Sequence, residues 1–477
     1  MIDESTVLIV GAGPTGLMTA LELTLNGTAA TVIDGRNDRG VRSKATTIWS
    51  RQLELLDRHG LAEPVIEAGT RVDRITVSTP YRRLGTFELG ELTTTRFPFG
   101  ISIPQPDFEA HLRLRLRELG ITVEGGLELI GLENTAGGVC VALRDVHGST
   151  YERHAAFVVG ADGPESSVRA ALNIKFSQYG PDTTFAITDV AISGTIPPRD
   201  VGYYYSTHGA LGLVPVGAGA FRIATGIPHG ADYLGQQGFR EALALRAGIT
   251  ADLVDLPWES HFQVKFRHAD TYSMGRAALV GDAAHTMSPA GGQGMNTGLQ
   301  DAANLAWRIT EIVSHSAEPS TLLDEYTQER RGDVKRVMQT SRLLTRFGAT
   351  STLSNRIERE LLSAAVRFTP AVRRKITHRL AQLDTRYAPS RRSFGEKSSL
   401  RPGDRLPDNL PTAPHHAHRT YRWTGSRSTP HLDASVAHTH TLNATAVPDD
   451  AAAVLGKKPA VITVRPDGHV TSYTALR

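Results

Sequence analysis

Hydrophobic residues in this chain of 477 residues form short uninterrupted runs that alternate with segments of helical periodicity. The first run covers residues 7–10, and residues 17–25 then place leucines at the spacing of an amphipathic helix. A second apolar run covers residues 30–33, so a strand–helix–strand unit is predicted at the N-terminus. Short runs of this kind are typical of buried parallel strands, because helices cover both faces of such sheets. The pattern therefore predicts an α/β fold.

A glycine-rich turn joins the first predicted strand to the helix. Its residues are Gly11, Gly13, Pro14, Thr15 and Gly16. The second strand ends at Asp34, about 20 residues after the first glycine, and in this context the pattern is the dinucleotide fingerprint. The start of the helix is expected to bind a pyrophosphate and Asp34 a ribose. A tight turn with no ligand is the structural alternative.

The segment 277–307 combines a strand, a carboxylate, a glycine loop and a helix start. The apolar run 277–280 ends at a Gly-Asp pair, and a helical pattern begins near residue 295. Little side chain intervenes in the loop, so its backbone can approach a flat ligand. The helix N-terminus offers N–H groups without helical partners. The candidate ligand-binding positions are Asp282, Pro289, Gly292, Gly294, Met295 and Asn296.

These motifs resemble those of the FAD-dependent aromatic hydroxylases, the group A flavoprotein monooxygenases with the para-hydroxybenzoate hydroxylase fold. The resemblance covers nearly the whole chain. It implies that Asp282 binds the ribityl and ribose region of FAD, and that the loop from Pro289 to Asn296 lies along the isoalloxazine ring. An ordinary strand–loop–helix would explain the glycines, but not Asp282, Gln293 and Asn296 together.

The same resemblance implies further cofactor contacts. Arg42 and Lys44 would reach the FAD pyrophosphate and flavin, although either could be a solvated surface charge. Gln105, just before a predicted helix, would contact the ribityl chain. Asp162 belongs to an Asp-Gly motif associated with both FAD and the nicotinamide cofactor. Alternatively, Asp162 caps the helical segment 166–172 or holds its turn.

Residues 185–266 alternate polar and apolar positions and are predicted to form a sheet over the flavin. Aromatic and small polar residues are mixed here, so this sheet is expected to supply the substrate pocket. Most of its aromatic residues are expected to be core. Arg222 and His208 are candidates to polarise a phenol, but no unique acid–base residue is predicted.

Three domains are expected, namely a Rossmann-like FAD-binding domain, an inserted β-sheet substrate domain and a short thioredoxin-like C-terminal domain. The predicted bounds are 1–75 with 100–175 and 270–345 for the first, 76–99 with 176–269 for the second, 346–399 for a helical region and linker, and 400–477 for the third. Residues 461–470 predict a hairpin in the last domain. Because that domain has no Cys-x-x-Cys pair, thiol redox chemistry is excluded.

Composition narrows the choice of partners. The net charge of +3 is too small to indicate a nucleic-acid or membrane partner, and no apolar run approaches a membrane span. The basic stretch 356–383 suggests a solvated face or a subunit contact, so a homo-oligomer is possible. Cys140 is the only cysteine, and histidines 415, 416, 418, 438 and 440 lack a ligand-spacing pattern, so no metal is expected. The protein is expected to be cytoplasmic.

One dinucleotide fold without a second fingerprint implies that NADPH or NADH visits FAD transiently. In the family, reduced FAD reacts with molecular oxygen at C4a, and the hydroperoxide oxygenates an electron-rich ring. The closest resemblance is to the aromatic polyketide hydroxylases, which predicts hydroxylation of a polycyclic aromatic polyketide. Baeyer–Villiger insertion, ring opening or inactivation of an antibiotic on the same flavin are alternatives. A flavin-binding protein without net redox turnover is an alternative of another class.

Overall fold

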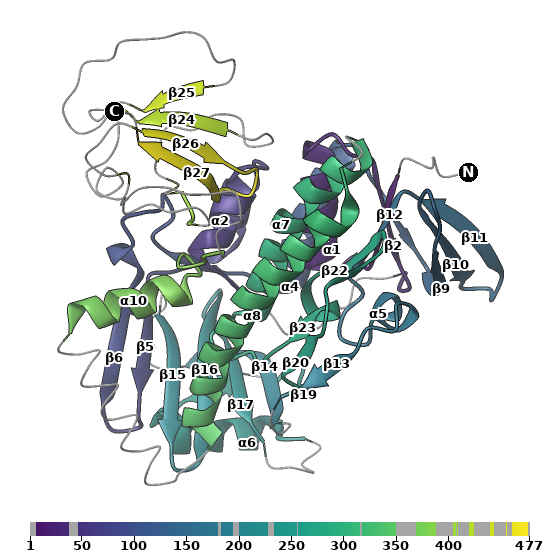
Figure 1. The fold of residues 1–477 in the computed structure, drawn as a ribbon. Helices are drawn as coiled ribbons and strands as arrows, with labels where there is room; N and C mark the ends of the chain where they lie inside the picture. Colours follow the sequence, from purple (N-terminus) through teal and green to yellow (C-terminus); the bar gives the residue numbers. More distant parts are fainter. Residues whose placement is uncertain are drawn as a thin grey trace.

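The computed structural model describes residues 6–37, 46–179, 183–193, 200–227, 233–254, 256–314, 317–349, 369–387, 404–406, 408, 419–423, 439–442, 455 and 460–475. Arg42 and Lys44 lie outside these residues. The largest elements are a six-stranded sheet, an eight-stranded sheet and the long helices that connect them (Figure 1).

The six-stranded sheet forms the core of the half that contains the predicted cofactor motifs, called the cofactor half below. Its strands, in spatial order, are β21 (Ser273–Met274), β22 (Ala277–Leu279), β12 (Phe157–Gly160), β1 (Val7–Val10), β2 (Ala30–Asp34) and β8 (Val123–Gly125). All neighbouring pairs are parallel except the edge pair of β21 with β22. All four residues of β1 are buried, as expected for a central strand covered on both faces. The predicted strand–helix–strand unit is confirmed.

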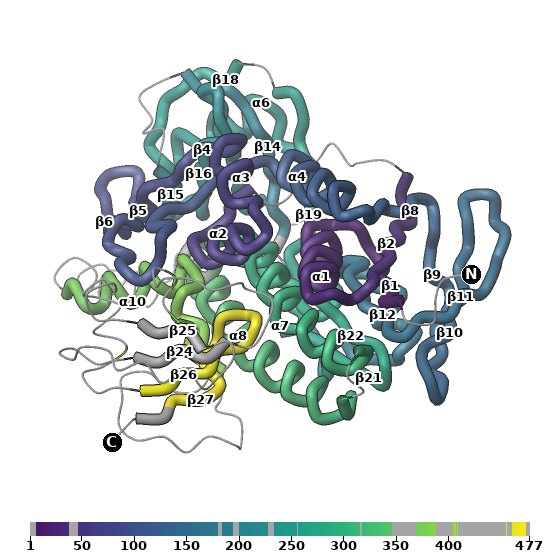
Figure 2. The backbone as a smooth tube through the Cα atoms, turned by 90° about the horizontal axis from the view of Figure 1, so that it is seen from above, coloured from purple at the N-terminus to yellow at the C-terminus, as the bar shows by residue number. Residues whose placement is uncertain are grey.

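Three helices pack together beside this sheet. Figure 2 shows α1 (Pro14–Leu25) next to α4 (Gln105–Glu118) and α7 (Gly294–Ser314). Helix α1 starts with Pro14 at its first position, where a missing N–H costs no helical hydrogen bond. Most residues of α7 are buried, including the polar Asn296, Asp301 and Asn304. This helix therefore lies inside the molecule, and its polar residues need internal partners.

Smaller elements surround this core. The three-stranded sheets are β3 (Thr47–Ile48), β7 (Gly100–Ser102) and β4 (Thr70–Val72); β9 (Leu127–Asn134), β10 (Val139–Asp145) and β11 (Thr150–Ala155); and β13 (Phe176–Gln178), β20 (Arg267–Ala269) and β23 (His285–Thr286). The short helical elements are α2 (Ser50–Asp57), α3 (Ala62–Ala68), η1 (Leu89–Glu91), α5 (Ser167–Ala171) and η3 (Gly281–Ala283).

The eight-stranded sheet forms the second half. Its strands are β18 (Asp252–Val254), β14 (Thr183–Ser193), β17 (Ala220–Gly226), β16 (Gly209–Gly217), β15 (Asp200–Ser206), β5 (Arg74–Ser78) and β6 (Arg83–Glu88), with β19 (Ser260–Val264) pairing with β14. Helix α6 (Gly235–Ala242) and the π-helical turn η2 (Leu243–Ala247) adjoin it. The predicted boundary between residues 75 and 76 falls inside β5, whose pairings with β15 and β6 place the whole strand in this sheet.

Helix α8 (Pro319–Ala349) links the two halves. Near its start the Tyr326 hydroxyl donates to the Leu279 carbonyl of β22, 2.8 Å away, and other parts of the helix contact β15 and β16. Figure 1 shows α8 running diagonally from one sheet to the other. The helical region predicted after residue 346 contains α10 (Pro370–Leu380), which packs against β6, while residues 350–368 lie outside the described chain.

The C-terminal strands form a four-stranded sheet in the order β25 (Thr439–Leu442), β24 (Arg419–Trp423), β26 (Ala460–Val464) and β27 (Val470–Ala475). Strands β26 and β27 pair antiparallel, which confirms the predicted hairpin. Buried ion pairs attach the C-terminal region to the main body. Arg465 contacts Glu329 of α8, and Arg405 contacts Glu54 of α2. A thioredoxin-like fold for the whole region stays a prediction.

The described residues show neither a membrane span nor a metal site. None of their helices combines the length and the apolar character needed to cross a membrane. These residues also contain no group of three or more His, Cys, Asp or Glu side chains arranged to hold a metal ion. Of the histidines considered for a metal, only His440 lies in the described part, in β25.

Candidate active site

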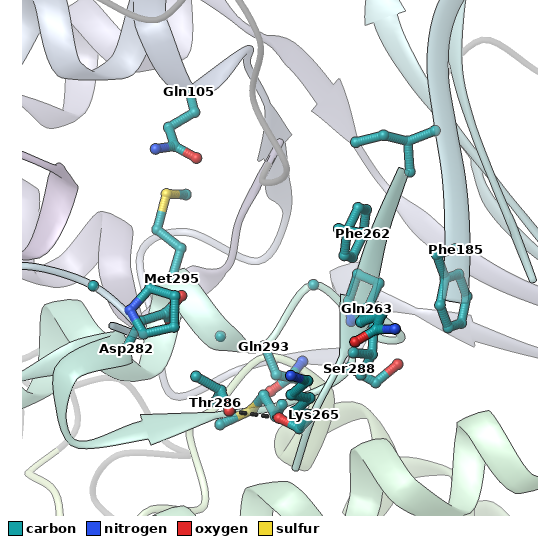
Figure 3. A pocket seen from close by; sticks show the side chains of 18 of the residues that line it. Gln105, Phe185, Phe262, Gln263, Lys265, Asp282, Thr286, Ser288, Gln293 and Met295 are labelled. Atoms are coloured by element: carbon teal, nitrogen blue, oxygen red, sulfur yellow. Dashed lines mark hydrogen bonds between the residues drawn. The ribbon is translucent and has the colours of Figure 1, made fainter. Parts of the chain in front are cut away.

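One cavity of about 1120 Å³ lies between the six-stranded and the eight-stranded sheet. On one side it is lined by the turn after β1, the end of β2 and the start of α7. Strands β14 to β17 and β19 line the other side. In Figure 3 the side chains of Met295 and Gln105 point toward each other, with Phe185 and Phe262 on the opposite side of the view. The cavity therefore joins the predicted cofactor and substrate regions.

The glycines of the first turn differ in what surrounds them. A Cβ atom on Gly16 would lie 1.9 Å from the Gly11 carbonyl oxygen, and one on Gly11 would lie 2.4 Å from the Ala161 oxygen. A Cβ on Gly13 would meet nothing within 4 Å, and Gly13 lines the cavity. Two of these glycines therefore allow close packing of the turn, whereas Gly13 leaves space open to a ligand at the N-terminus of α1.

Asp34 ends β2 at the edge of the cavity. Its carboxylate accepts hydrogen bonds from the Ala12 N–H at 2.8 Å, the Arg36 N–H at 2.8 Å and the Arg36 side chain at 3.2 Å. Burial favours the neutral acid, but the hydrogen bonds from Arg36 and Ala12 outweigh it and hold the pKa of Asp34 below its ordinary value. Asp34 is therefore a fixed, ionised acceptor, as ribose binding requires. Sequence reasoning missed Arg36.

The loop before α7 is held from behind. The Asn296 side-chain amide donates to the Thr47 and Gly292 carbonyls at 2.7 and 2.6 Å, and its oxygen accepts from the Trp49 N–H at 2.9 Å. The Trp49 indole N–H donates to the Gly291 carbonyl at 3.0 Å. Asn296 is fully buried, so its side chain braces the loop, while Pro289, Gly292, Gly294 and Met295 line the cavity.

A buried ionic cluster centred on Asp301 of α7 holds η3 and β23, which precede this loop. The Asp301 carboxylate lies 2.6 Å from His285 Nε2 and 2.6 Å from Arg330 Nε, and it accepts the Gly281 N–H at 3.0 Å. All three side chains are fully buried. Burial opposes ionisation of Asp301, but His285 and Arg330 outweigh it and lower its pKa. The only sequence signal for this cluster is that Asp301, an acid, interrupts the apolar helical pattern of residues 299–306.

Three other predicted contacts also line the cavity. Asp162 Oδ2 accepts from the Ser167 hydroxyl at 3.0 Å and the Val168 N–H at 3.1 Å, so this oxygen caps α5. Its Oδ1 atom is buried without a protein partner. The Gln105 amide donates to Glu109 Oε1 at 2.8 Å. Asp282 is exposed at the cavity, on the turn η3.

The opposite wall contains the two predicted substrate candidates. Arg222, on β17, is paired with Asp189 through Nε and Nη2, each 2.7 Å from a carboxylate oxygen. Its Nη1 atom is buried without a protein partner, and the residue lines the cavity. His208 also lines the cavity, but it is exposed in the turn between β15 and β16.

Two cavity residues were missed by sequence reasoning. The Tyr203 hydroxyl accepts the Gly291 N–H at 3.1 Å, which ties the eight-stranded sheet to the loop before α7. Burial raises the pKa of Tyr203 to about 12, although the hydrogen bond from Gly291 opposes this, so its hydroxyl stays neutral near pH 7. Arg246, on η2, donates from Nη1 to the Gly226 carbonyl at 2.6 Å. Tyr203 lies in a run of tyrosines on β15 and Arg246 in the turn η2, and neither sequence context indicates the hydrogen bond that the residue forms.

Comparison with known proteins identifies the family. A family model described as FAD binding domain matches residues 4–341. The 6-methylpretetramide 4-monooxygenase of Streptomyces rimosus is 34% identical over 413 residues, covering 82% of this chain and 72% of that protein. The rifampicin monooxygenase of Rhodococcus hoagii is 31% identical over 409 residues, covering 83% and 81%. The structure of OxyS anhydrotetracycline hydroxylase from Streptomyces rimosus aligns with a TM-score of 0.80 and 30% identity, covering 98% of this chain and 95% of that one.

The chain is a flavoprotein of the FAD-binding domain family. Within that family it is an FAD-dependent monooxygenase of the aromatic hydroxylase type, as the sequence motifs predicted. The α/β fold class is confirmed by the same comparison. The cavity fits FAD, because it combines open space beside Gly13 with the unpartnered Asp162 Oδ1 atom. Individual contacts to FAD, including those of Arg42 and Lys44, stay predictions.

Proposed function

We propose that this monooxygenase hydroxylates a polycyclic aromatic polyketide, using FAD, molecular oxygen and NADPH or NADH. One observation carries the proposal. A single cavity is lined on one side by the dinucleotide motif and on the other by apolar and cationic side chains of the eight-stranded sheet. Its volume of about 1120 Å³ leaves room for a multi-ring substrate beside the cofactor. Relatives named for tetracycline-type substrates support the same substrate class.

The residues predicted for the cofactor have distinct tasks in this proposal. The N-terminus of α1 at Gly13 would hold the pyrophosphate, and Asp34 the adenosine ribose. Gln105 and Asp282 would hold the ribityl chain. The loop up to Met295 would present backbone N–H groups to the ring edge. Bound and reduced FAD supplies the activation of molecular oxygen, which no protein side chain provides.

The substrate wall would orient and polarise the aromatic ring. Arg222 lines the cavity and is held by Asp189, and its Nη1 atom, which has no protein partner, would donate to a phenolic oxygen. A hydrogen bond from a guanidinium favours the phenolate, and a phenolate ring is the more electron-rich. Arg222 cannot take the phenol proton, because a guanidinium stays protonated. Nor can neutral Tyr203 serve as a base.

The test is oxygen incorporation by the FAD-loaded protein. It would be incubated with NADPH, or with NADH, and a panel of polycyclic phenols under ¹⁸O₂. The proposal expects stoichiometric incorporation of one labelled oxygen as a new hydroxyl, with all rings intact. If no panel member stimulates NADPH or NADH oxidation, the proposal that polycyclic phenols are the substrates is wrong.

Oxygenation of a finished antibiotic is the second candidate. The relative named rifampicin monooxygenase supports this possibility. Insertion of oxygen into a ring and hydroxylation give products of equal mass, so connectivity from NMR must separate them. Lactone or ring-opened products, or turnover of rifampicin in place of polycyclic phenols, would favour this candidate.

A further inference from the structure

Arg246 is a cation in the cavity wall without a carboxylate partner. It lies on η2, and its Nη1 atom donates to the Ala210 carbonyl at 3.3 Å, the Gly226 carbonyl at 2.6 Å and the Thr225 hydroxyl. All three acceptors are neutral. Among the residues that the structure describes, no Asp or Glu side chain forms an ion pair with Arg246. The backbone therefore fixes this guanidinium but leaves its charge uncompensated.

The partial burial of Arg246 makes that charge costly. Burial lowers the pKa of Arg246, and no charged group opposes this effect. The group still carries its charge, because the pKa of arginine starts above 12. Arg222, the other arginine of this wall, has its charge neutralised by Asp189. A charge held in a cavity without a counter-ion is stabilised by an anionic ligand.

The rest of this wall, within the described chain, supplies no negative charge that could compensate Arg246. The described cavity residues from the eight-stranded sheet and η2 include His208, Arg222 and Arg246 but no Asp or Glu. The wall would therefore attract an anionic ligand and repel a cationic one.

The two arginines mark different positions along β17, because Arg222 lies on this strand and Arg246 donates to its last residue. Arg246 bonds to Gly226 of β17, four residues after Arg222 on the same strand (226 minus 222), which corresponds to about 13 Å of extended chain. Gly217 of the neighbouring strand β16 lies at the end of the sheet opposite to Gly226, and it approaches Thr70 of β4. Figure 1 shows α6, which precedes η2, at the end of the sheet away from α1 and α7. Arg246 thus lies toward the end far from the cofactor half.

We propose that Arg246 forms an anion subsite that binds an ionised oxygen group, a carboxylate or an enolate, at the end of the substrate remote from the ring that is oxygenated. This inference rests on the proposed function and narrows its substrate class to polycyclic compounds with an acidic group. Arg222 would hold the reacting end, so the two arginines would fix the direction in which an elongated substrate enters. A nicotinamide cofactor also carries anionic groups, and the test separates the two sources.

The test uses the holoenzyme and two probes of nearly equal shape, 9,10-anthraquinone-2-carboxylate and the neutral 9,10-anthraquinone-2-carboxamide. Their dissociation constants would be measured by isothermal titration calorimetry. The wild type is expected to bind the carboxylate about 10-fold more tightly, as for a charge-assisted hydrogen bond. In Arg246→Gln the ratio should fall to about 1. Arg246→Lys, which keeps the charge, should keep most of the preference.

Arg240→Gln is the matched control. Arg240 lies on the neighbouring helix α6, 3.7 Å from Asp252, and does not line the cavity. It should leave the ratio unchanged. An equal ratio in the wild type, or an unchanged ratio in Arg246→Gln, would overturn the proposal. So would a loss of NADP⁺ affinity in Arg246→Gln with the probe ratio intact, because the anion would then belong to the nicotinamide cofactor.

Calorimetry needs no turnover, so the subsite and the proposed function can fail separately. If the carboxylate preference depends on Arg246 but no substrate is oxygenated, the subsite stands and the function is wrong. If polycyclic phenols are oxygenated but the wild type binds the carboxylate and carboxamide probes equally, the function stands and the subsite is wrong.

Discussion

The two walls of the cavity offer different kinds of groups to their ligands. The cofactor wall presents mainly backbone, in the glycine turn after β1 and the loop before α7. The substrate wall presents side chains from a sheet, among them Arg222 and Arg246. Backbone groups depend on the path of the chain, whereas sheet side chains can be replaced with little change to that path. We therefore expect changes that move the backbone of the cofactor wall to affect folding and FAD binding together, while changes to side chains of the substrate wall affect substrate binding without changing FAD binding.

The largest effect is expected at Gly16. A Cβ there would lie 1.9 Å from the Gly11 oxygen, so Gly16→Val must move the turn itself. We expect loss of FAD from the purified protein and a lower melting temperature. Gly13→Ala is the matched variant, because its Cβ meets no protein atom within 4 Å. It should weaken FAD binding with little change in the melting temperature of the apoprotein, as fluorescence titration and calorimetry would measure. Equal losses of apoprotein stability in both variants would contradict the distinction between Gly16, which packs the turn, and Gly13, which faces the ligand.

Asp301→Asn should destabilise the cofactor wall without touching a ligand. It removes one of the two carboxylates, Asp301 and Asp333, that form ion pairs with the buried Arg330, and breaking a buried ion pair costs about 3–5 kcal/mol. The pKa of Asp301 is lowered by folding, so its contribution is present above about pH 4 and is lost as the pH falls through the folded value. The free energy of unfolding in urea would be measured from pH 7 to pH 3, and the difference between variant and wild type should be smaller at pH 3. A constant difference would contradict the ionised state of Asp301.

Arg222→Met is expected to separate the two walls. It removes the donor at the substrate, so affinity for a polycyclic phenol should fall about 10- to 100-fold, as for a lost hydrogen bond to a charged group. FAD affinity should stay unchanged, since Arg222 lies on the opposite wall. Asp189→Asn is the companion variant, because it keeps Arg222 but loosens its position. Its loss of affinity for the phenol should be smaller than that of Arg222→Met. A parallel loss of FAD in Arg222→Met would break the distinction between the walls.

The smallest effect is expected at Asp162. Asp162→Ala removes the oxygen that accepts from Val168 N–H at the start of α5, which costs about 1 kcal/mol of stability. It also removes Oδ1, the atom free for a cofactor. Ser166→Ala, which removes the hydroxyl that accepts the Arg169 N–H, is the control for capping alone. FAD affinity should fall in Asp162→Ala but not in Ser166→Ala. Equal FAD affinity in both would leave Asp162 a structural residue.

The cofactor wall could be predicted from the sequence because the residues that form it are close together along the chain. The strand, turn and helix of residues 7–25 are contiguous, and so are residues 277–296, so short motifs specify both backbone shape and ligand. The partners of Asn296 and Asp301 could not be predicted, since Thr47 and Arg330 are distant in the sequence. These contacts exist only after the helices have packed.

The substrate wall could be predicted as a sheet that supplies the pocket, but the contacts of its polar residues could not. Alternation along residues 220–226 indicates a strand, yet the partner of Arg222 depends on the register that places Asp189 opposite it. Arg246 belongs to a π-helical turn whose contacts are carbonyls of two strands, and backbone acceptors have no sequence signature. Arg222 was therefore found by residue type, while Arg246 and Tyr203 required the structure.

The most direct test of the account is anaerobic reduction of the bound flavin by NADPH in a stopped-flow instrument. The holoenzyme would be mixed with NADPH alone, with simple phenols, and with polycyclic phenols that carry a carboxylate. The account predicts that the acidic polycyclic compounds accelerate loss of the oxidised flavin absorbance and that the simple phenols do not. Equal rates with every compound would contradict a substrate wall that recognises an elongated anionic aromatic, and acceleration by simple phenols alone would contradict its size.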